Sequence, residues 1–162
     1  MANVAVRAID ASTWRTMRDV RLAALLDAPH AFGSSYEREI SFSQDDWLWR
    51  ISQGANFLAY TGGPGSAPVG IVGAFEPLPH TAELVSMWVH PQARGQGVGR
   101  TLVETILQWA HNEGHNFVHL WVTETNDPAR CLYERCGFAL TGERKPLPSH
   151  PEYAEVAMVR PA

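Results

Sequence analysis

The chain has little cysteine, no long apolar run and no surplus of basic charge. Its two cysteines, Cys131 and Cys136, lie five residues apart in an expected helix, so they face different directions and no disulfide is implied. No apolar run approaches the roughly 18 residues that a membrane-spanning helix needs, so a membrane protein is not expected. The net charge of −4 argues against a general nucleic-acid-binding surface, which needs concentrated Lys and Arg.

The amino-terminal segment lacks the marks of a secretory signal. Met1–Asp10 has neither a basic patch nor an apolar core, and its polar and apolar residues alternate as in a β-strand. We therefore expect a cytoplasmic location. The 162 residues, 45% of them hydrophobic, are enough for one domain over residues 1–162 that folds without a disulfide or a metal.

Apolar periodicity predicts antiparallel strands in the first part of the chain and alternating helices and strands in the second part. The first part is predicted to hold a strand, two helices and three antiparallel strands, over Val4–Ala8, Trp14–Leu26, Ser43–Ile51, Asn56–Tyr60, Val69–Phe75 and Ala82–Val89. The second part is predicted to alternate helices and strands, over Val98–Ala110, Phe117–Val122, Ala129–Cys136, from Phe138 onward and over Tyr153–Val159. A helix joins the third antiparallel strand to the next strand, so those two should be parallel. The pattern indicates a mixed α+β sheet, with an irregular stretch over Ala31–Ile40.

A glycine-rich turn, Arg94–Arg100, stands between a predicted strand and the most regular predicted helix. Its three alternate glycines allow backbone amides to approach an anion, and the helix start adds unpaired N–H groups and a partial positive charge. The arginines at its two ends add cationic donors. A tight turn with helix-capping glycines is the alternative, but three glycines between two arginines exceed what a cap requires. The segment therefore predicts an anion-binding site.

The spacing of this turn narrows the type of anion. A P-loop needs Lys followed by Ser or Thr after its last glycine, whereas Arg100-Thr101 follows Gly99 here. A dinucleotide site prefers Gly-x-Gly-x-x-Gly in a βαβ repeat, with an acidic residue about 20 positions later. Glu124 answers that requirement only weakly, and the antiparallel strands before the turn do not fit such a repeat.

Two motifs resemble those of the GNAT superfamily of N-acetyltransferases. The family's first pattern, Arg/Gln-x-x-Gly-x-Gly/Ala, is matched by Arg94-Gly95-Gln96-Gly97-Val98-Gly99. Its second pattern, Asn-x-x-Ala-x-x-x-Tyr-x-x-x-Gly-Phe, is matched by Asn126, Ala129, Tyr133 and Gly137-Phe138. The order of predicted elements along the chain is also similar to that of the family.

The resemblance implies a GNAT fold with acetyl-CoA as the co-substrate and no metal. Such a fold has a central, twisted, mostly antiparallel sheet of about seven strands, with a parallel pair at the cofactor cleft and about four flanking helices. The backbone of the glycine-rich turn would hold the pyrophosphate, the main chain of Met87–Val89 would run beside the pantetheine arm, and Asn126 would bond that arm or cap a helix. The implied cofactor-binding residues are Met87, Trp88, Val89, Arg94, Gly95, Gln96, Gly97, Val98, Gly99, Arg100 and Asn126.

The resemblance also implies catalytic roles for two residues. Tyr133 would protonate the departing thiolate, because a phenol has a pKa of about 10, near that of a thiol; its alternative role is a core aromatic. Glu83 would accept the amine proton, often through water, and strand alternation places it on one face with Met87 and Val89. A solvated strand-end charge is its alternative. A main-chain N–H near Trp88 or Val89 would stabilise the developing oxyanion.

The implied activity is direct transfer of an acetyl group from acetyl-CoA to a primary amine, on a small molecule or a protein, in a ternary complex. A noncatalytic acyl-CoA-binding sensor or interaction module is the alternative. The acidic balance is compatible with a cationic acceptor, and Ala28–Ile51 and Lys145–Tyr153 are expected to line its site. We expect no nucleic-acid or membrane partner. The resemblance is compatible with a homodimer.

One pair of histidines has the spacing of zinc ligands but lacks the other features of a zinc site. His111 and His115 are four residues apart, but Gly114 interrupts the helix and Glu113 is misplaced for a zinc His-Glu-x-x-His site. We expect a solvated helix end there.

Overall fold

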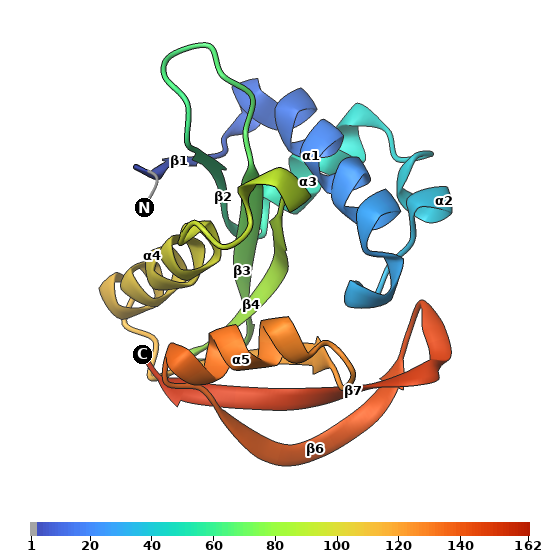
Figure 1. Ribbon diagram of the computed structural model, residues 1–162, viewed down its shortest axis with the longest axis vertical. Helices are drawn as coiled ribbons and strands as arrows, with labels where there is room; N and C mark the ends of the chain where they lie inside the picture. The colour runs from blue at the N-terminus through green and yellow to red at the C-terminus, as the bar shows by residue number, and fades with distance from the viewer. Residues whose placement is uncertain (1–2) are drawn as a thin grey trace.

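The computed structural model describes residues 3–162, which form a seven-stranded sheet with helices on both faces (Figure 1). The strands are β1 (Ala5–Ala8), β2 (Gly54–Tyr60), β3 (Gly70–Leu78), β4 (Thr81–Val89), β5 (Phe117–Thr123), β6 (Ala139–Leu147) and β7 (His150–Pro161). Their order across the sheet is β1-β2-β3-β4-β5-β7-β6. The predicted mixed α+β fold with about seven strands is confirmed.

Five α-helices accompany the sheet within residues 3–162: α1 (Trp14–Asp27), α2 (Tyr36–Glu39), α3 (Gln44–Ser52), α4 (Val98–Asn112) and α5 (Asp127–Arg135). Local sequence explains where they begin. At α3, the Ser43 hydroxyl accepts a hydrogen bond from the Asp46 amide, and the Asp46 carboxylate accepts one from the Ser43 amide. No helix of the described part is long and apolar enough to cross a membrane.

The prediction of an irregular stretch over Ala31–Ile40 holds for residues 32–35 and is wrong for Tyr36–Glu39, which form α2. Ser35 caps this helix by accepting a hydrogen bond from the amide of Arg38. Four residues are too few to show helical periodicity in a sequence. The last of them, Glu39, is fully buried, which is unusual for a carboxylate without cationic partners.

The parallel pair of β4 and β5 separates part-way along its length, whereas the other neighbouring strands pair antiparallel. The β4–β5 pairing ends where Leu84 lies opposite Leu120, although β4 continues to Val89 and β5 to Thr123. The predicted parallel connection is therefore confirmed, and the carboxyl halves of the two strands diverge.

A β-bulge at Ser86 reverses the alternation of side chains along β4. The strand carries one extra residue relative to β3, and Ser86 adopts a φ of 60°, which is uncommon for a residue with a side chain. Before the bulge, Glu83 and Val85 line a cavity on the α1 side of the sheet; after it, Met87 and Val89 pack against the α4 side. The prediction that Glu83, Met87 and Val89 share one face is wrong, because a period of two does not survive an inserted residue.

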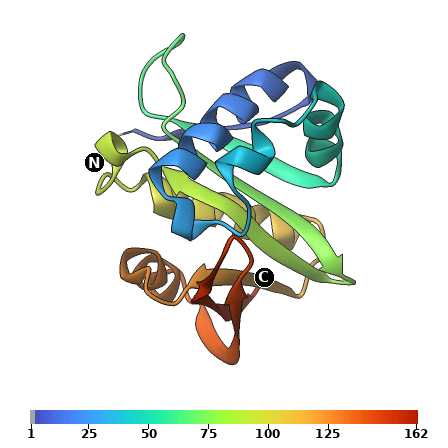
Figure 2. The same ribbon diagram turned by 90° about the vertical axis from the view of Figure 1, so that its right-hand side faces the viewer.

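Helices α1 and α4 lie on opposite faces of the sheet (Figure 1 and Figure 2), and each covers a separate hydrophobic core. The larger core joins α4 and α5 to the strands and contains Ala59 and Val72; the smaller joins α1 to the same strands through Leu58 and Ile71. Adjacent residues of β2 and β3 thus serve different cores, as the pleat of a strand requires. Figure 1 shows β2–β4 between α1 and α4. It shows β6 and β7 at the other end of the sheet, next to α5.

The predicted solvated helix end is correct for His111 and wrong for His115. His111 is exposed, but the side chain of His115 is only 6% exposed. Its Nε2 lies 2.9 Å from Oε2 of Glu76, and its ring stacks near Trp109 with centroids 5.1 Å apart. A turn at Gly114, with φ of 80°, directs the His115 ring back onto the helix.

Candidate active site

The glycine-rich turn leads directly into α4 and presents its backbone. Gly95 and Gly97 have φ of 75° and 85°, a left-handed conformation that glycine adopts without strain. Gly97 is the N-cap of α4 and supplies no side chain to the amides of the first helical turn. A Cβ at Gly99 would lie 3.0 Å from Leu132 Cδ2 and 3.3 Å from Met87 Cε, so glycine lets α4 approach both neighbours closely. This backbone cradle fits an anion such as a pyrophosphate.

The two arginines of the turn are paired with carboxylates of the protein. Arg94 Nη2 lies 2.6 Å from Asp27 Oδ2, and Arg100 Nε lies 2.8 Å from Glu104 Oε1 on the next turn of α4. A hydrogen bond from Trp88 Nε1, together with Arg94, holds the pKa of the Asp27 carboxyl below its usual value. Arg94 thereby fastens the end of α1 to the turn, and its guanidinium is engaged with Asp27.

The separation of β4 and β5 opens a cavity of about 90 Å³. Its walls are the bulge of β4, the end of β5 and the first turns of α5, and Met87, Asn126 and Tyr133 all line it. Met87 of β4 and two residues of the second motif, Asn126 and Tyr133, therefore meet at one place. Asn126 Oδ1 also accepts a hydrogen bond from the Ala129 amide at 3.4 Å, so the capping role and a position at the cavity coexist.

Tyr133 combines a core position with access to this cavity. The residue is only 5% exposed, and its ring packs edge-to-face against Phe138 with centroids 5.9 Å apart. Burial raises the pKa of the Tyr133 phenol, so the group stays protonated at neutral pH. A protonated phenol at the cavity wall can donate a proton, and the same ring also fills the core.

Val89 has the backbone amide that faces the opening between β4 and β5. The amide of His90 donates to the carbonyl of Val69 at 2.8 Å, toward β3. Successive amides of a strand point to opposite sides. The amide of Trp88 therefore points toward β3, as that of His90 does, and the amide of Val89 points toward β5. The indole of Trp88 is buried against α1. Of the two amides predicted for an oxyanion, that of Val89 is directed at the opening.

A second cavity, of about 270 Å³, adjoins the first. Both cavities are lined by Phe32, residues 84–86 and Trp121. Glu83 lines only the second cavity, where its Oε1 lies 3.4 Å from Nδ1 of His119. The Glu83 side chain is only 20% exposed, so the carboxylate belongs to the cavity wall rather than to a solvated strand end. The bulge of β4 is thus a wall common to the two cavities.

Comparison with known sequences identifies the family. Residues 17–138 match the family described as Acetyltransferase (GNAT) family. The chain belongs to this family. Probable N-acetyltransferase family 8 member 5 of Mus musculus is 32% identical to the GNAT chain over 78 residues, which cover 48% of this chain and 30% of that protein. The match therefore spans less than a third of that relative's length.

Solved structures share the GNAT fold over nearly the whole chain. Spermidine N-acetyltransferase from Vibrio cholerae, in complex with CoA and spermine, has a TM-score of 0.76 and 17% identity, covering 98% of this chain and 95% of that chain. A putative acetyltransferase from Salmonella typhimurium with its cofactor acetyl-CoA has a TM-score of 0.77 and 16% identity, covering 99% and 94%. At these identities the likeness shows the fold.

Some residues of the GNAT chain at the second cavity were not singled out from the sequence. Of the two segments expected to line an acceptor site, Ala31–Ser34 and Lys145 do line this cavity. Trp121 of β5 and Glu155 of β7 join them. Lys145 lies opposite Glu155 in the β6–β7 ladder, so pairing the last two strands from the sequence would have revealed this contact.

A buried ion network supports the wall of this cavity. Glu39 accepts hydrogen bonds from Arg21 Nε and Nη2 at 3.0 and 2.9 Å, and from Arg50 Nη1 at 2.7 Å. Burial alone would raise the pKa of Glu39, but the two guanidinium groups outweigh it and lower the pKa from 4.5 to about 2. Arg21 Nη1 also lies 3.3 Å from the hydroxyl of Ser86. The network therefore connects α1, α2 and α3 to the bulge of β4.

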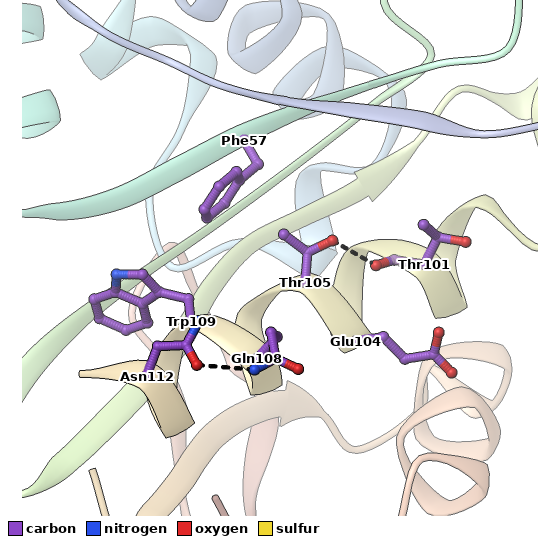
Figure 3. Close-up of a pocket in the computed structure, with 7 residues that line it drawn as sticks. All are labelled: Phe57, Thr101, Glu104, Thr105, Gln108, Trp109 and Asn112. Carbon is purple, nitrogen blue, oxygen red and sulfur yellow. Dashed lines mark hydrogen bonds between the residues drawn. The ribbon is translucent and has the colours of Figure 1, made fainter. Parts of the chain in front are cut away.

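A separate groove of about 520 Å³ runs along α4, away from these residues (Figure 3). Thr101, Thr105 and Trp109 line it at helical spacing, with Phe57 of β2 on the facing side. Glu104 is its one titratable side chain, and that carboxylate pairs with Arg100. The groove's volume alone does not make it a reaction site, and the two residues predicted to be catalytic, Glu83 and Tyr133, line the smaller cavities instead.

Proposed function

We propose that the protein transfers the acetyl group of acetyl-CoA to a primary amine by direct attack in a ternary complex. The observation that carries this proposal is the β4 bulge, where residues 84–86 form a wall of both the Tyr133 cavity and the Glu83 cavity. A donor and an acceptor bound on the two sides would meet at that wall. A relative of the same fold that is a spermidine N-acetyltransferase supports an amine as the acceptor.

The donor fits the features of the first cavity and the turn beside it. The backbone from Gly95 to Gly99 would hold the pyrophosphate, since left-handed glycines and an uncapped helix start present amides to an anion. The pantetheine arm would run along Met87–Val89 in the opening between β4 and β5, with Asn126 beside it. Acetyl-CoA supplies the activated acetyl group, and the protein positions its carbonyl.

The acceptor-side residues would then handle protons and charge. Glu83, directly or through water, takes a proton from the acceptor ammonium, and the neutral nitrogen attacks the thioester carbonyl carbon. A C–N bond forms as the C–S bond breaks, while the amide of Val89 donates to the carbonyl oxygen where negative charge grows. The phenol of Tyr133 gives its proton to the departing sulfur, and the second proton, which the new amide nitrogen must lose, passes through water to the phenolate.

The test is release of the free CoA thiol by the purified protein, with acetyl-CoA, over a panel of small amines and peptide amines. Amine-dependent release, with an acetylated amine identified by mass spectrometry, is the expected result. Reactions without amine measure background hydrolysis. Tight CoA binding with no amine-dependent release over the whole panel would contradict catalysis and favour an acyl-CoA-binding sensor.

A further inference from the structure

The only lysine of the 162-residue chain, Lys145, projects its ammonium into the cavity that contains Glu83. Its Nζ lies 3.4 Å from Glu155 Oε1 and 4.2 Å from the centroid of the Trp121 ring. A carboxylate on one side and an aromatic face on the other are the two groups that proteins use to hold an alkylammonium ion. The protein's own lysine therefore marks an ammonium-binding position.

The sheet aligns the members of this position on one face. Glu155 lies opposite Lys145 of β6 on one side and opposite Thr123 of β5 on the other, so their side chains project in the same direction. Trp121, two residues before Thr123, shares that direction by strand alternation. The two charged groups and the ring thus come from three neighbouring strands, which fix their spacing.

Negative charge at this position exceeds the positive charge available to it. Arg21 also lines the cavity, but its guanidinium is paired with Glu39. Glu83 and Glu155 remain, with Lys145 as the neighbouring alkylammonium and the His119 imidazole 3.4 Å from Glu83. Burial, reinforced by the charge of Glu83, raises the pKa of Glu155 despite the nearby Lys145. A further cation would relieve the unfavourable interaction between the two carboxylates.

The position lies beside the reaction cavity but outside it. Glu155 and Lys145 line the acceptor-side cavity and are not among the residues that line the Tyr133 cavity, whereas Trp121 lines both. A cation held between Glu155 and Trp121 is therefore not the nitrogen that reacts with the acetyl group. It is a second charged group of the same acceptor.

We propose that Glu155 and Trp121 form a subsite for a second ammonium group of a diamine acceptor, and that Lys145 occupies this subsite until the acceptor displaces it. The proposal rests on the amine acceptor proposed above. Lys145 has a flexible stem and a side chain that is 46% exposed, so it can swing into solvent. Its departure leaves Glu155 free to bind the incoming ammonium, and the opposite end of the acceptor then extends toward the bulge of β4.

The experiment compares the binding of diamines and of monoamines of equal chain length to the protein saturated with CoA, by calorimetry. Putrescine, cadaverine and 1,8-diaminooctane are the probes, with butylamine, pentylamine and octylamine as their matched monoamines. At least one diamine should bind about tenfold more tightly than its monoamine, because a charge-assisted contact to Glu155 is gained. If no diamine is preferred by the wild-type protein, the subsite is overturned.

Two variants that break the same ion pair separate a binding role from a structural role. Glu155→Gln should abolish the diamine preference, whereas Lys145→Met should strengthen diamine binding severalfold, because the internal competitor is removed. CoA binding should be unchanged in both variants, which also checks that each is folded. Arg144→Met, which changes the neighbouring exposed residue of β6, is the matched control and should change none of these values. Equal weakening of diamine binding by both variants would overturn the proposal.

Turnover of the same amines is measured separately, so that the two proposals can fail independently. Acetylation of monoamines and diamines without any difference in binding would support the transferase function and overturn the subsite. Preferential diamine binding that depends on Glu155, with no acetylation of any amine, would support the subsite and contradict the transferase function.

Discussion

The donor side and the acceptor side of this molecule are built in different ways. The proposed donor side comes from two continuous stretches, Met87–Arg100 and Asn126–Tyr133, and it would present mainly backbone to acetyl-CoA. The acceptor side gathers side chains from α1, the segment after it, and β4, β5, β6 and β7. A backbone cradle depends on local conformation, whereas a cavity made of distant side chains depends on the whole sheet being assembled. The two sides should therefore respond differently to substitution.

The largest expected effect is on stability, at the ion network behind the acceptor side. Glu39→Gln should lower the free energy of unfolding by about 3–5 kcal/mol, because it leaves two buried guanidinium groups without their shared carboxylate. Urea unfolding measures this loss. Glu104→Gln, which breaks the exposed pair with Arg100 on α4, is the control and should leave the urea midpoint unchanged. Equal midpoints for both variants would remove the distinction between a buried scaffold and a surface pair.

The same carboxylate predicts a dependence of stability on pH. The pKa of Glu39 is lowered in the folded protein, from 4.5 to about 2, so its contribution is complete above pH 4.5 and is lost as the pH falls toward 2. The loss over this window should be roughly 3 kcal/mol. Urea midpoints measured across these pH values should fall more steeply for the wild-type protein than for Glu39→Gln. Parallel pH profiles would show that another group dominates acid unfolding.

Sequence patterns could predict the turn and the helix start of the proposed donor side because their determinants are local. Glycines at Gly95, Gly97 and Gly99, followed by a regular apolar helix, specify a turn and a helix start within a few residues. The succession of elements along the chain and the parallel β4–β5 connection likewise follow from segment lengths and periodicity, whereas the position of β7 between β5 and β6 was not predicted. Even here the ion pair of Arg94 could not be predicted, since its partner Asp27 lies at the end of another helix.

The acceptor side could be located only approximately. The segments beginning at Ala28 and Lys145 were expected to contribute, but the contact between Lys145, Glu155 and Trp121 requires the register of three strands. The bulge at Ser86 has no recognisable sequence signal, because the residue with left-handed φ is not a glycine. Strict alternation along β4, without the bulge, would place Glu83 and Met87 on the same face of the sheet.

At the boundary between the two sides, Tyr133→Phe should affect the rate without affecting donor binding. Loss of the phenolic proton should lower kcat by about a hundredfold, as expected for removal of a general acid, while CoA affinity stays within about twofold. Tyr60→Phe, on β2, is the control for a lost phenol and should keep the wild-type rate. Stopped assays of CoA release and calorimetry with CoA give the two values. A wild-type kcat for Tyr133→Phe would reduce Tyr133 to a core aromatic.

The smallest expected effect tests whether the donor side depends on backbone conformation alone. Gly97 and Gly114 have nearly equal φ, 85° and 80°, at opposite ends of α4, and a Cβ at Gly114 would meet no neighbour within 4 Å. Replacing either glycine with Ala should cost about 1 kcal/mol of stability, because the left-handed conformation is strained for alanine. Only Gly97→Ala should also weaken CoA binding, by about tenfold, since only Gly97 shapes the amides that would face the pyrophosphate. Calorimetry on the two variants, matched in stability, isolates that difference, and equal CoA affinities would mean that the turn does not bind the donor through its backbone.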